Sequence, residues 1–342
     1  MAASRSIKKY CHLRKFEFLS LQDKIYFLIS YDLRVYLNQT EYANTTAEVS
    51  DTTLIRMSSG TTSKIVNVSG DVNIHLTLTT PIGHADENIP SLVFLHFWGG
   101  SSKTFSSVTK ILSPHFPTVA LSFRGWGDSS GPDEAGAYTI ADFSADVETV
   151  IQHLCLKAVI LIGHSMGGKV AAAIAGRYIL PAGLLKGLVL LAPAPPGPLS
   201  LPDPVMREQQ LHAFDTIENA EGAIRTVLTA PENQALIDDL VKSIAEDMVR
   251  GNKWAKIAWP TYGMSEDISK HFDRVDIPVL VVAGGSDVIE PPERMKTEIR
   301  DKLNDKLDGK ASLVVVEGSG HLLPLEKPEE VARAVKEFVE SL

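Results

Sequence analysis

The chain has 342 residues, of which 44% are hydrophobic, so it can bury a large core as one domain with an insertion. Its formal net charge of −9 argues against nucleic-acid binding, which normally uses a basic surface. It contains no stretch of about 18 apolar residues, so no transmembrane segment is expected. The cysteines are Cys11 and Cys155, too few for a disulfide framework, and this favours a reducing, cytoplasmic compartment.

The first part of the chain differs from the rest. Residues 1–16 contain basic side chains and no acidic ones, which is typical of a mitochondrial transit peptide and equally of a poorly ordered basic extension. We therefore expect residues 1–60 to be an N-terminal extension that is disordered or serves in targeting. A mitochondrial location is the alternative to the cytoplasm.

From Lys64 onward, strand and helix patterns alternate. Residues 65–68 and 72–79 alternate apolar and polar side chains around Ser69-Gly70-Asp71, which predicts a hairpin at an antiparallel edge. Short apolar runs predict buried strands over residues 91–97, 118–123, 158–162, 187–192, 277–283 and 312–316. Helices are predicted over residues 103–112, 138–154, 170–175, 293–302 and 328–341. This order predicts an α/β fold with a doubly wound, mostly parallel sheet and a site at the carboxyl ends of its strands.

Residues 193–263 interrupt the alternation. The segment opens with several prolines, which cannot continue a strand or a helix. Helical patterns follow over residues 205–214, 220–229 and 233–250. Near its end lie Trp254, Trp259 and Tyr262, aromatic side chains that could line an apolar pocket or simply attach the segment to the core.

The most informative stretch is Gly163-His164-Ser165-Met166-Gly167, which stands between a predicted strand and a predicted helix. A serine at so sharp a turn adopts a strained backbone, and glycines on either side let the strand and helix approach closely. The helix that begins behind Ser165 directs free N–H groups and the positive end of its dipole at the same place. We therefore expect Ser165 to be a nucleophile and the N–H of Met166 to bind a developing oxyanion. His164 neighbours the nucleophile only in sequence, and we interpret it as structural.

This G-x-S-x-G turn, continued by a further glycine, resembles the nucleophile elbow of α/β-hydrolases, in their serine esterase and haloperoxidase-like branch. The resemblance covers residues 64–342. It implies a mostly parallel sheet flanked by helices, with a helical cap inserted after the sixth strand. On this basis we assign residues 61–193 and 263–342 to the core and residues 194–262 to the cap.

The resemblance also implies partners for the serine. A hydroxyl is a weak nucleophile at neutral pH, so it needs a base, and the base needs an orienting acid. In this fold the order along the chain is serine, acid, histidine. Asp287 in Gly-Gly-Ser-Asp and His321 in Gly-Ser-Gly-His each follow a predicted strand and resemble the acid and histidine loops of the family. We therefore expect Ser165, Asp287 and His321 to form a catalytic triad.

A second oxyanion donor is expected after the strand at residues 91–97. The family usually has His-Gly there, whereas this chain has His96-Phe97-Trp98, and by position the donor is the backbone N–H of Trp98. Phe97 takes the place of the usual glycine and joins the aromatic residues that could line the substrate pocket.

No cofactor or metal is expected. The glycine-rich residues 99–104 and 125–131 miss the spacing of nucleotide-binding motifs, and no cluster of cysteine and histidine indicates a metal site. The expected partner is a small ester-like molecule.

These residues predict a serine hydrolase that cleaves a carboxylic ester or thioester of a mostly apolar small molecule through an acyl-enzyme. Alternatives on the same triad are a cofactor-free, haloperoxidase-like perhydrolase and a C–C bond hydrolase. A non-catalytic ligand receptor built on a hydrolase fold is an alternative of another class.

Overall fold

The structure is a computed structural model that describes residues 60–81, 89–200 and 203–342. The prediction of a disordered or targeting extension concerns residues 1–60 and lies outside the described residues, except for Gly60. Among the described helices, none has the length and apolar character needed to cross a membrane.

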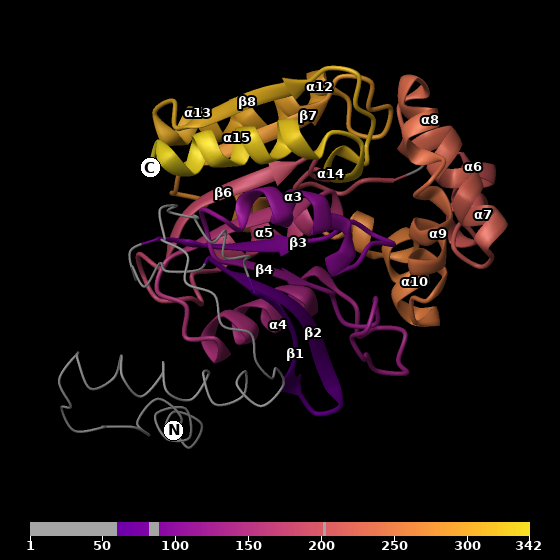
Figure 1. Cartoon of the computed structure of the whole chain (residues 1–342), viewed down its shortest axis with the longest axis horizontal. Coiled ribbons are helices and arrows are strands. Elements are labelled where there is room, and N and C mark those ends of the chain that lie inside the picture. Colours follow the sequence, from indigo (N-terminus) through magenta and orange to yellow (C-terminus); the bar gives the residue numbers. More distant parts are fainter. Residues whose placement is uncertain (1–59, 82–88, 201–202) are drawn as a thin grey trace, which may run out of the picture. The chain divides into compact units, whose positions relative to one another are not determined.

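A mixed sheet forms the centre of the described chain (Figure 1). Its strand order is β1-β2-β4-β3-β5-β6-β7-β8. β2 pairs antiparallel with β1 and β4, and the other neighbours are parallel, so the predicted hairpin and the mostly parallel sheet are confirmed. The strands are β1 (Gly60–Ser69), β2 (Val72–Thr80), β3 (Ser91–Leu95), β4 (Thr118–Leu121), β5 (Val159–His164), β6 (Leu185–Leu191), β7 (Val279–Gly284) and β8 (Ala311–Val316).

Burial of the central strands follows their apolar patterns, whereas the two edge strands depart from them: Ile65 in β1 is 60% exposed. β5 and β7 are buried along their whole length, as continuous apolar runs require when helices cover both faces. The sequence predicts β8 to be buried as well, and this is wrong for its centre, where Val314 and Val315 are 38% and 37% exposed. β8 is the last strand of the sheet, so it lacks a neighbour on one side.

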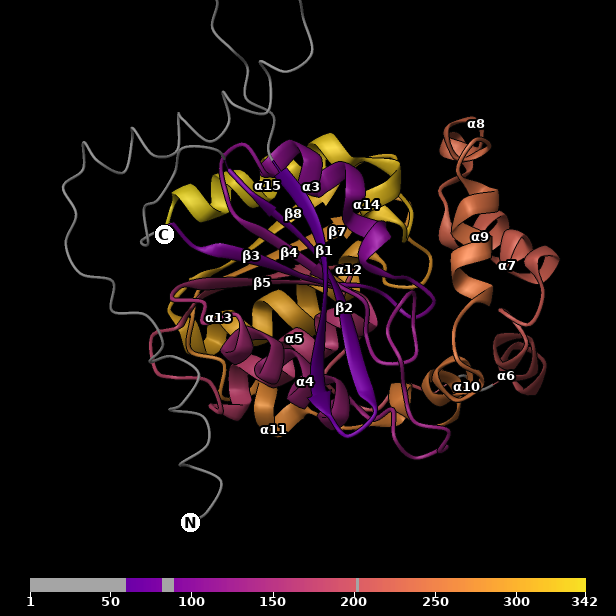
Figure 2. The same ribbon diagram turned by 60° about the horizontal axis from the view of Figure 1, so that its bottom comes forward.

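Helices cover both faces of the sheet (Figure 2). α4, α5 and α11 pack on one face, whereas α3 and α15 pack against each other on the opposite face. The core helices are η1 (Ser102–Phe105), α3 (Ser106–Leu112), α4 (Ile140–His153), α5 (Met166–Arg177), η4 (Gly263–Ser265), α11 (Ser269–Phe272), α12 (Pro292–Arg294), η5 (Met295–Asp301), α13 (Lys302–Leu307), α14 (Leu323–Glu326) and α15 (Pro328–Glu340).

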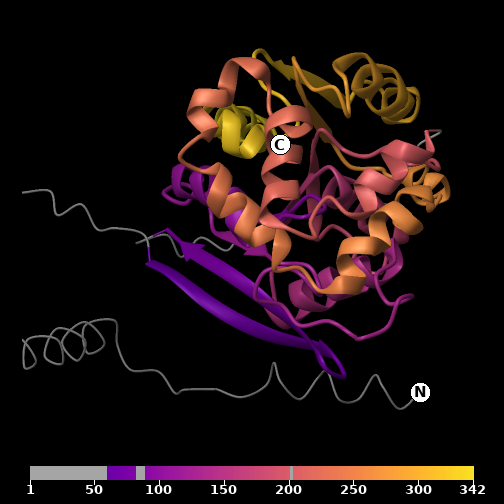
Figure 3. The same cartoon turned by 90° about the vertical axis from the view of Figure 1, so that its right-hand side faces the viewer.

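The chain between β6 and β7 forms a group of helices on the side toward which the parallel strands point (Figures 1 and 3). We call residues 194–262 the cap. Its helices are α6 (Pro204–Leu211), α7 (Ile217–Ala223), η2 (Ile224–Leu228), η3 (Pro231–Asn233), α8 (Gln234–Ile237), α9 (Val241–Val249) and α10 (Lys253–Thr261).

The predicted cap helices need two corrections. A single helix over residues 233–250 is wrong, because the chain turns between α8 and α9 at the adjacent acids Asp238 and Asp239, residues that favour turns over helix interiors. α10 is absent from the sequence prediction. It contains Pro260, which has no N–H to donate to the Lys256 carbonyl four residues earlier; the Trp98 ring N–H donates to that carbonyl instead, at 2.9 Å.

Candidate active site

Ser165 occupies a strained turn between β5 and α5. Its backbone has φ 54° and ψ −115°, a left-handed conformation that a residue with a side chain rarely adopts. The turn is held by the Ser165 N–H, which donates to the Leu191 carbonyl at 2.9 Å. A Cβ at Gly163 would collide with the Gly167 carbonyl, and a Cβ at Gly167 would collide with the Leu95 carbonyl. The two glycines of the motif are therefore required by close packing of β5, α5 and the end of β3.

His321 and Asp287 are bonded to each other at the ends of neighbouring strands. The Nδ1 atom of His321 lies 2.8 Å from Oδ2 of Asp287. The other oxygen of Asp287 accepts the N–H of Ile289 at 2.8 Å and of Glu290 at 3.0 Å. Because β7 and β8 are parallel neighbours, the loops that follow them meet, and a Cβ at Gly284 would collide with the Gly320 carbonyl.

The electrostatics of this pair favour a charged carboxylate and a basic imidazole. Burial by itself would raise the pKa of Asp287, but the adjacent His321 and the hydrogen bonds to the carboxylate outweigh burial and lower it. Burial would lower the pKa of His321, but the Asp287 carboxylate outweighs burial and raises it. The carboxylate of Asp287 thus makes the His321 imidazole more basic, so that the ring can accept a second proton.

His164 brings the serine turn and the histidine loop together. It precedes Ser165, and its Nε2 donates to the His321 carbonyl at 2.7 Å. Burial lowers the pKa of His164 to about 3, so the ring is neutral, and its contact agrees with the structural role expected from the sequence.

Both Ser165 and His321 are described, and the Ser165 hydroxyl is not hydrogen bonded to the His321 imidazole. Such contacts are often long in the absence of substrate.

The turn after β3 lies against the start of α5. The collision of a Gly167 Cβ with the Leu95 and His96 carbonyls places the two segments in contact. Met166 is the first residue of α5, so its N–H has no acceptor within the helix. Among the described residues, the N–H of Met166 and the N–H of Trp98 donate to no protein group. Neither N–H is therefore engaged by another group of the described chain.

Sequence reasoning missed His96, the residue whose hydrogen bonds hold the turn after β3. His96 is fully buried, and its Nδ1 donates to the Phe97 carbonyl at 2.7 Å while its Nε2 accepts the Phe123 N–H at 2.9 Å. Burial lowers the pKa of His96 to about 4, so the ring is neutral, as this bonding requires. The signal in the sequence was a histidine at the end of an apolar strand.

Of the four predicted pocket residues, Phe97 lines a cavity and the three aromatic residues of the cap do not. Phe97 is buried and lines a cavity of about 360 Å³ between the turn after β3 and α9 of the cap. Trp254, Trp259 and Tyr262 do not line this cavity. The Trp254 ring N–H donates to Asp133 at 2.5 Å, and the Tyr262 hydroxyl donates to the Ala135 carbonyl at 2.7 Å, so these two side chains attach the cap to the β4–α4 loop. Their role in a pocket stays a prediction.

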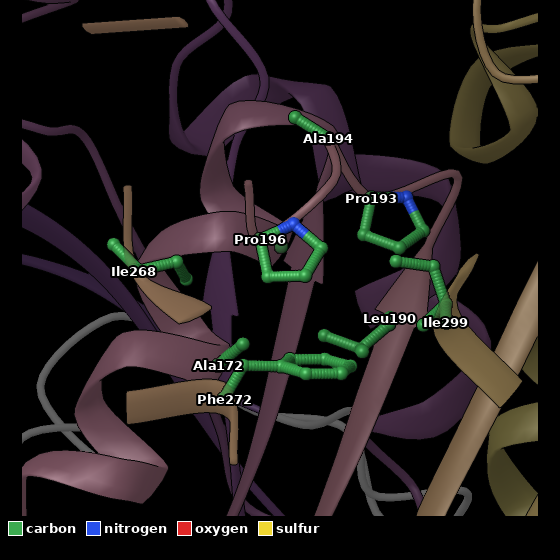
Figure 4. Close-up of a pocket in the computed structure, with 9 residues that line it drawn as sticks. Ala172, Leu190, Pro193, Ala194, Pro196, Ile268, Phe272 and Ile299 are labelled. Atoms are coloured by element: carbon green, nitrogen blue, oxygen red, sulfur yellow. The ribbon is translucent and has the colours of Figure 1, made fainter. Parts of the chain in front are cut away.

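A second gap lies behind the serine turn and is not a ligand site. Figure 4 shows it enclosed by apolar side chains, among them Ala172, Leu190, Pro193 and Phe272. It has no room for a water molecule, and it offers no polar side chain for recognition. In the described part of the chain, no group of His, Cys, Asp or Glu side chains is arranged to hold a metal.

Glu290 is a further buried acid that the sequence did not identify. It lies three residues after Asp287, is 2% exposed, and pairs with Arg294 at 3.0 Å. Burial raises the pKa of Glu290 to about 7, against the effects of His321 and Arg294. Two carboxyl groups with opposite pKa shifts therefore lie close to the same histidine.

Comparisons with known proteins agree with this architecture. The family model of the alpha/beta hydrolase family matches residues 92–334. A Haemophilus influenzae protein with a provisional esterase/lipase assignment is 28% identical over 261 residues, covering 74% of this chain and 84% of that protein. The pimeloyl-[acyl-carrier protein] methyl ester esterase of Neisseria meningitidis is 25% identical over 262 residues, covering 74% of this chain and 95% of that protein.

Among solved structures, the bromoperoxidase of Bacillus anthracis is similar in fold. It superposes with a TM-score of 0.71 at 18% identity, covering 82% of this chain and all of that one. The family model spans most of the chain, and the strand order, the serine turn and the inserted helices all lie within or beside the matched region. The chain therefore belongs to the alpha/beta hydrolase family of enzymes.

Proposed function

We propose that the protein is a serine hydrolase that cleaves a carboxylic ester or thioester through an acyl-enzyme. The observation that carries the proposal is the 2.8 Å hydrogen bond between His321 and Asp287, next to a serine with a left-handed backbone. An imidazole whose Nδ1–H donates to a carboxylate keeps Nε2 unprotonated, which is the state of a general base. The two esterase relatives support this reaction class by their names.

In the proposed mechanism, His321 takes the proton of Ser165 as the serine oxygen attacks the carbonyl carbon of the substrate. Asp287 stabilises the imidazolium that forms. His321 then returns the proton to the leaving alcohol or thiol, which departs and leaves an acyl-serine. Water repeats the same steps on the acyl-enzyme and releases the acid.

The N–H groups of Met166 and Trp98 are the proposed oxyanion donors. Each would bind the negative oxygen of the tetrahedral intermediate more strongly than the neutral carbonyl of the substrate. One such donor stabilises a transition state by about 3 kcal/mol. Their lack of protein acceptors supports this role, because a bond already made inside the protein would compete with the oxyanion.

The cavity beside Phe97 is the proposed binding space for the substrate. Its volume of about 360 Å³ suits a small molecule. Its apolar lining includes Phe97 and Ile244, and the charged residues Lys103, Glu246, Asp247 and Arg250 line it as well. Ser165 and His321 are not among its lining residues. We infer a substrate with an apolar part beside Phe97 and Ile244 and at least one polar or charged group.

The test is covalent labelling of the intact protein with a fluorophosphonate, followed by peptide mass spectrometry. We expect the label on Ser165, no label in Ser165→Ala, and loss of p-nitrophenyl ester hydrolysis by about 10⁴-fold or more in that variant. Esters of graded chain length would define the acyl preference. A peroxide-dependent halogenation assay run beside them would identify a perhydrolase.

Two outcomes would contradict the proposal. Labelling of a different serine would show that the nucleophile is misassigned. Unchanged ester hydrolysis in Ser165→Ala would exclude the acyl-enzyme, and ligand binding that persisted without any turnover would favour a receptor.

A further inference from the structure

A buried carboxylate that the proposed mechanism does not use lies next to the histidine loop. Glu326 ends α14 and is 1% exposed. Its Oε2 accepts the N–H of Gly320 at 3.0 Å, and its Oε1 accepts the N–H of Leu322 at 3.1 Å. One carboxylate therefore holds the residues on both sides of His321. Hydrogen bonds to an ionised acceptor are about twice as strong as neutral ones.

The same carboxylate also binds the cap. Oε2 accepts the backbone N–H of Ala230 at 2.9 Å and the side-chain amide of Asn233 at 2.8 Å. Asn233 in turn donates to the Gly318 carbonyl at 2.7 Å. Ala230 and Asn233 lie between η2 and α8, so Glu326 connects the cap with the loop that carries His321.

Two further contacts join the cap to the loop that carries His321. The carbonyl of Leu228, the last residue of η2, accepts the N–H of His321 at 2.9 Å and of Leu322 at 3.1 Å. A Cβ at Gly320 would come within 2.5 Å of the Ala230 nitrogen. The cap segment therefore cannot move relative to His321 without breaking buried hydrogen bonds, each of which would leave an unsatisfied group.

We propose that Glu326 is a positioning residue that couples the placement of the cap to the orientation of the His321 imidazole. N–H donors from two segments far apart in sequence converge on this single acceptor. The inference rests on the proposed role of His321 as the base. A general base displaced by about 1 Å can lose about 100-fold in rate, so control of its backbone has a large effect on turnover.

The first test is Glu326→Gln. An amide supplies one acceptor oxygen, and its NH₂ would face N–H donors that it cannot accept. We expect kcat for a p-nitrophenyl ester to fall by about tenfold or more, with KM changed far less. Glu329→Gln is the matched control, because Glu329 is an exposed glutamate three residues further along.

The pH profile separates positioning from a general loss of stability. The charged or titratable groups that act on His321 are Asp287 and Glu290 after β7, Glu326 in α14 and His164 in β5. Removal of the Glu326 charge should shift the acid limb of the kcat profile to lower pH, since a carboxylate that favours the imidazolium is lost. Glu329→Gln should leave this limb unchanged.

The second variant, Asn233→Ala, removes the cap side of the connection and keeps the carboxylate. It tests the coupling even if Glu326→Gln fails to fold. We expect kcat to fall several-fold without a shift of the acid limb. Amide hydrogen exchange should rise in both residues 228–233 and residues 318–323, because the two segments lose a shared attachment.

The outcomes distinguish this inference from the proposed function. Wild-type kcat and pH profile in folded Glu326→Gln, or wild-type kcat and exchange in Asn233→Ala, would overturn the positioning role while Ser165 labelling still supported the hydrolase. Absence of Ser165 labelling in the wild-type protein would overturn both.

Discussion

Three buried histidines surround the serine turn, and their surroundings give them different chemistry. Burial lowers the pKa of His96 to about 4 and that of His164 to about 3, and each ring donates to a backbone carbonyl. His321 is bonded to a carboxylate, and its pKa is raised. Of the three, His321 is therefore the ring suited to carry a proton during a reaction.

Glu290 adds a second titrating group at the same place. Its pKa of about 7 lies well above the ordinary 4.5, chiefly because the side chain is buried. At pH values between about 4.5 and 7, Glu290 is protonated in the folded protein but ionised in the unfolded chain. Protonation of Glu290 therefore favours folding below about pH 4.5, and this contribution is lost as the pH rises through about 7.

We predict that Glu290→Gln removes this pH dependence. Because glutamine does not ionise, the free energy of unfolding of the variant should rise relative to wild type between pH 4.5 and 7, by on the order of 2–3 kcal/mol. Urea unfolding at several pH values would measure the difference. A constant difference across this range would show that Glu290 does not titrate there. Glu293→Gln, on the exposed side of α12, is the control.

At the scale of elements, the serine turn depends on how closely β5 approaches α5. Collisions at Gly163 and Gly167 would involve backbone carbonyls, which cannot rotate out of the way as a flexible side chain can. A helix and a strand in this geometry have no room for even one methyl group. The strained backbone conformation of the turn is therefore at Ser165, whereas Gly163 and Gly167 allow β5 and α5 to approach each other closely.

We predict that Gly163→Ala destabilises the protein by about 3 kcal/mol or more and abolishes labelling of Ser165, because β5 and α5 must separate. Gly222→Ala is the matched control. Gly222 is an exposed residue of helix α7 with no atom within 4 Å of an added Cβ, so the substitution should stabilise the protein by up to about 1 kcal/mol. Thermal unfolding and labelling measure both effects. Equal stability of the two variants would contradict the packing argument.

At the scale of the whole described molecule, the cap is attached both to the loop that carries His321 and to the turn after β3. Glu326 joins it to the histidine loop, and the Trp98 ring N–H, in the turn after β3, donates to the Lys256 carbonyl of the cap at 2.9 Å. Asp247 of α9 accepts the hydroxyl of Ser101 and pairs with Lys103 at 3.2 Å. The cap is therefore bound by hydrogen bonds and an ion pair to several loops of the core.

We predict that the cap and the core unfold together. The tryptophans Trp98, Trp126, Trp254 and Trp259 all lie in the cap or at its junction with the core, so their fluorescence reports this boundary. Urea transitions followed by tryptophan fluorescence and by far-UV circular dichroism should coincide. A fluorescence transition at lower urea concentration would mean that the cap separates first.

The sequence determined the parts of the protein that local physics controls. Apolar runs bounded by turn residues defined the strands, their alternation with helices indicated a mostly parallel sheet, and the serine turn was marked by its glycines. The hairpin, the strand-to-helix turn and the insertion after β6 follow from such patterns. Their signals lie within a few residues, so tertiary contacts were not needed to recognise them.

The tertiary structure decided what depends on residues far apart in the chain. The exposure of β8 follows from its place at the edge of the sheet. The roles of His96, Glu290 and Glu326 could not be read from the sequence, because each depends on partners or burial created by folding. A buried polar side chain is explained by the donors and acceptors around it, and these are brought together only in three dimensions.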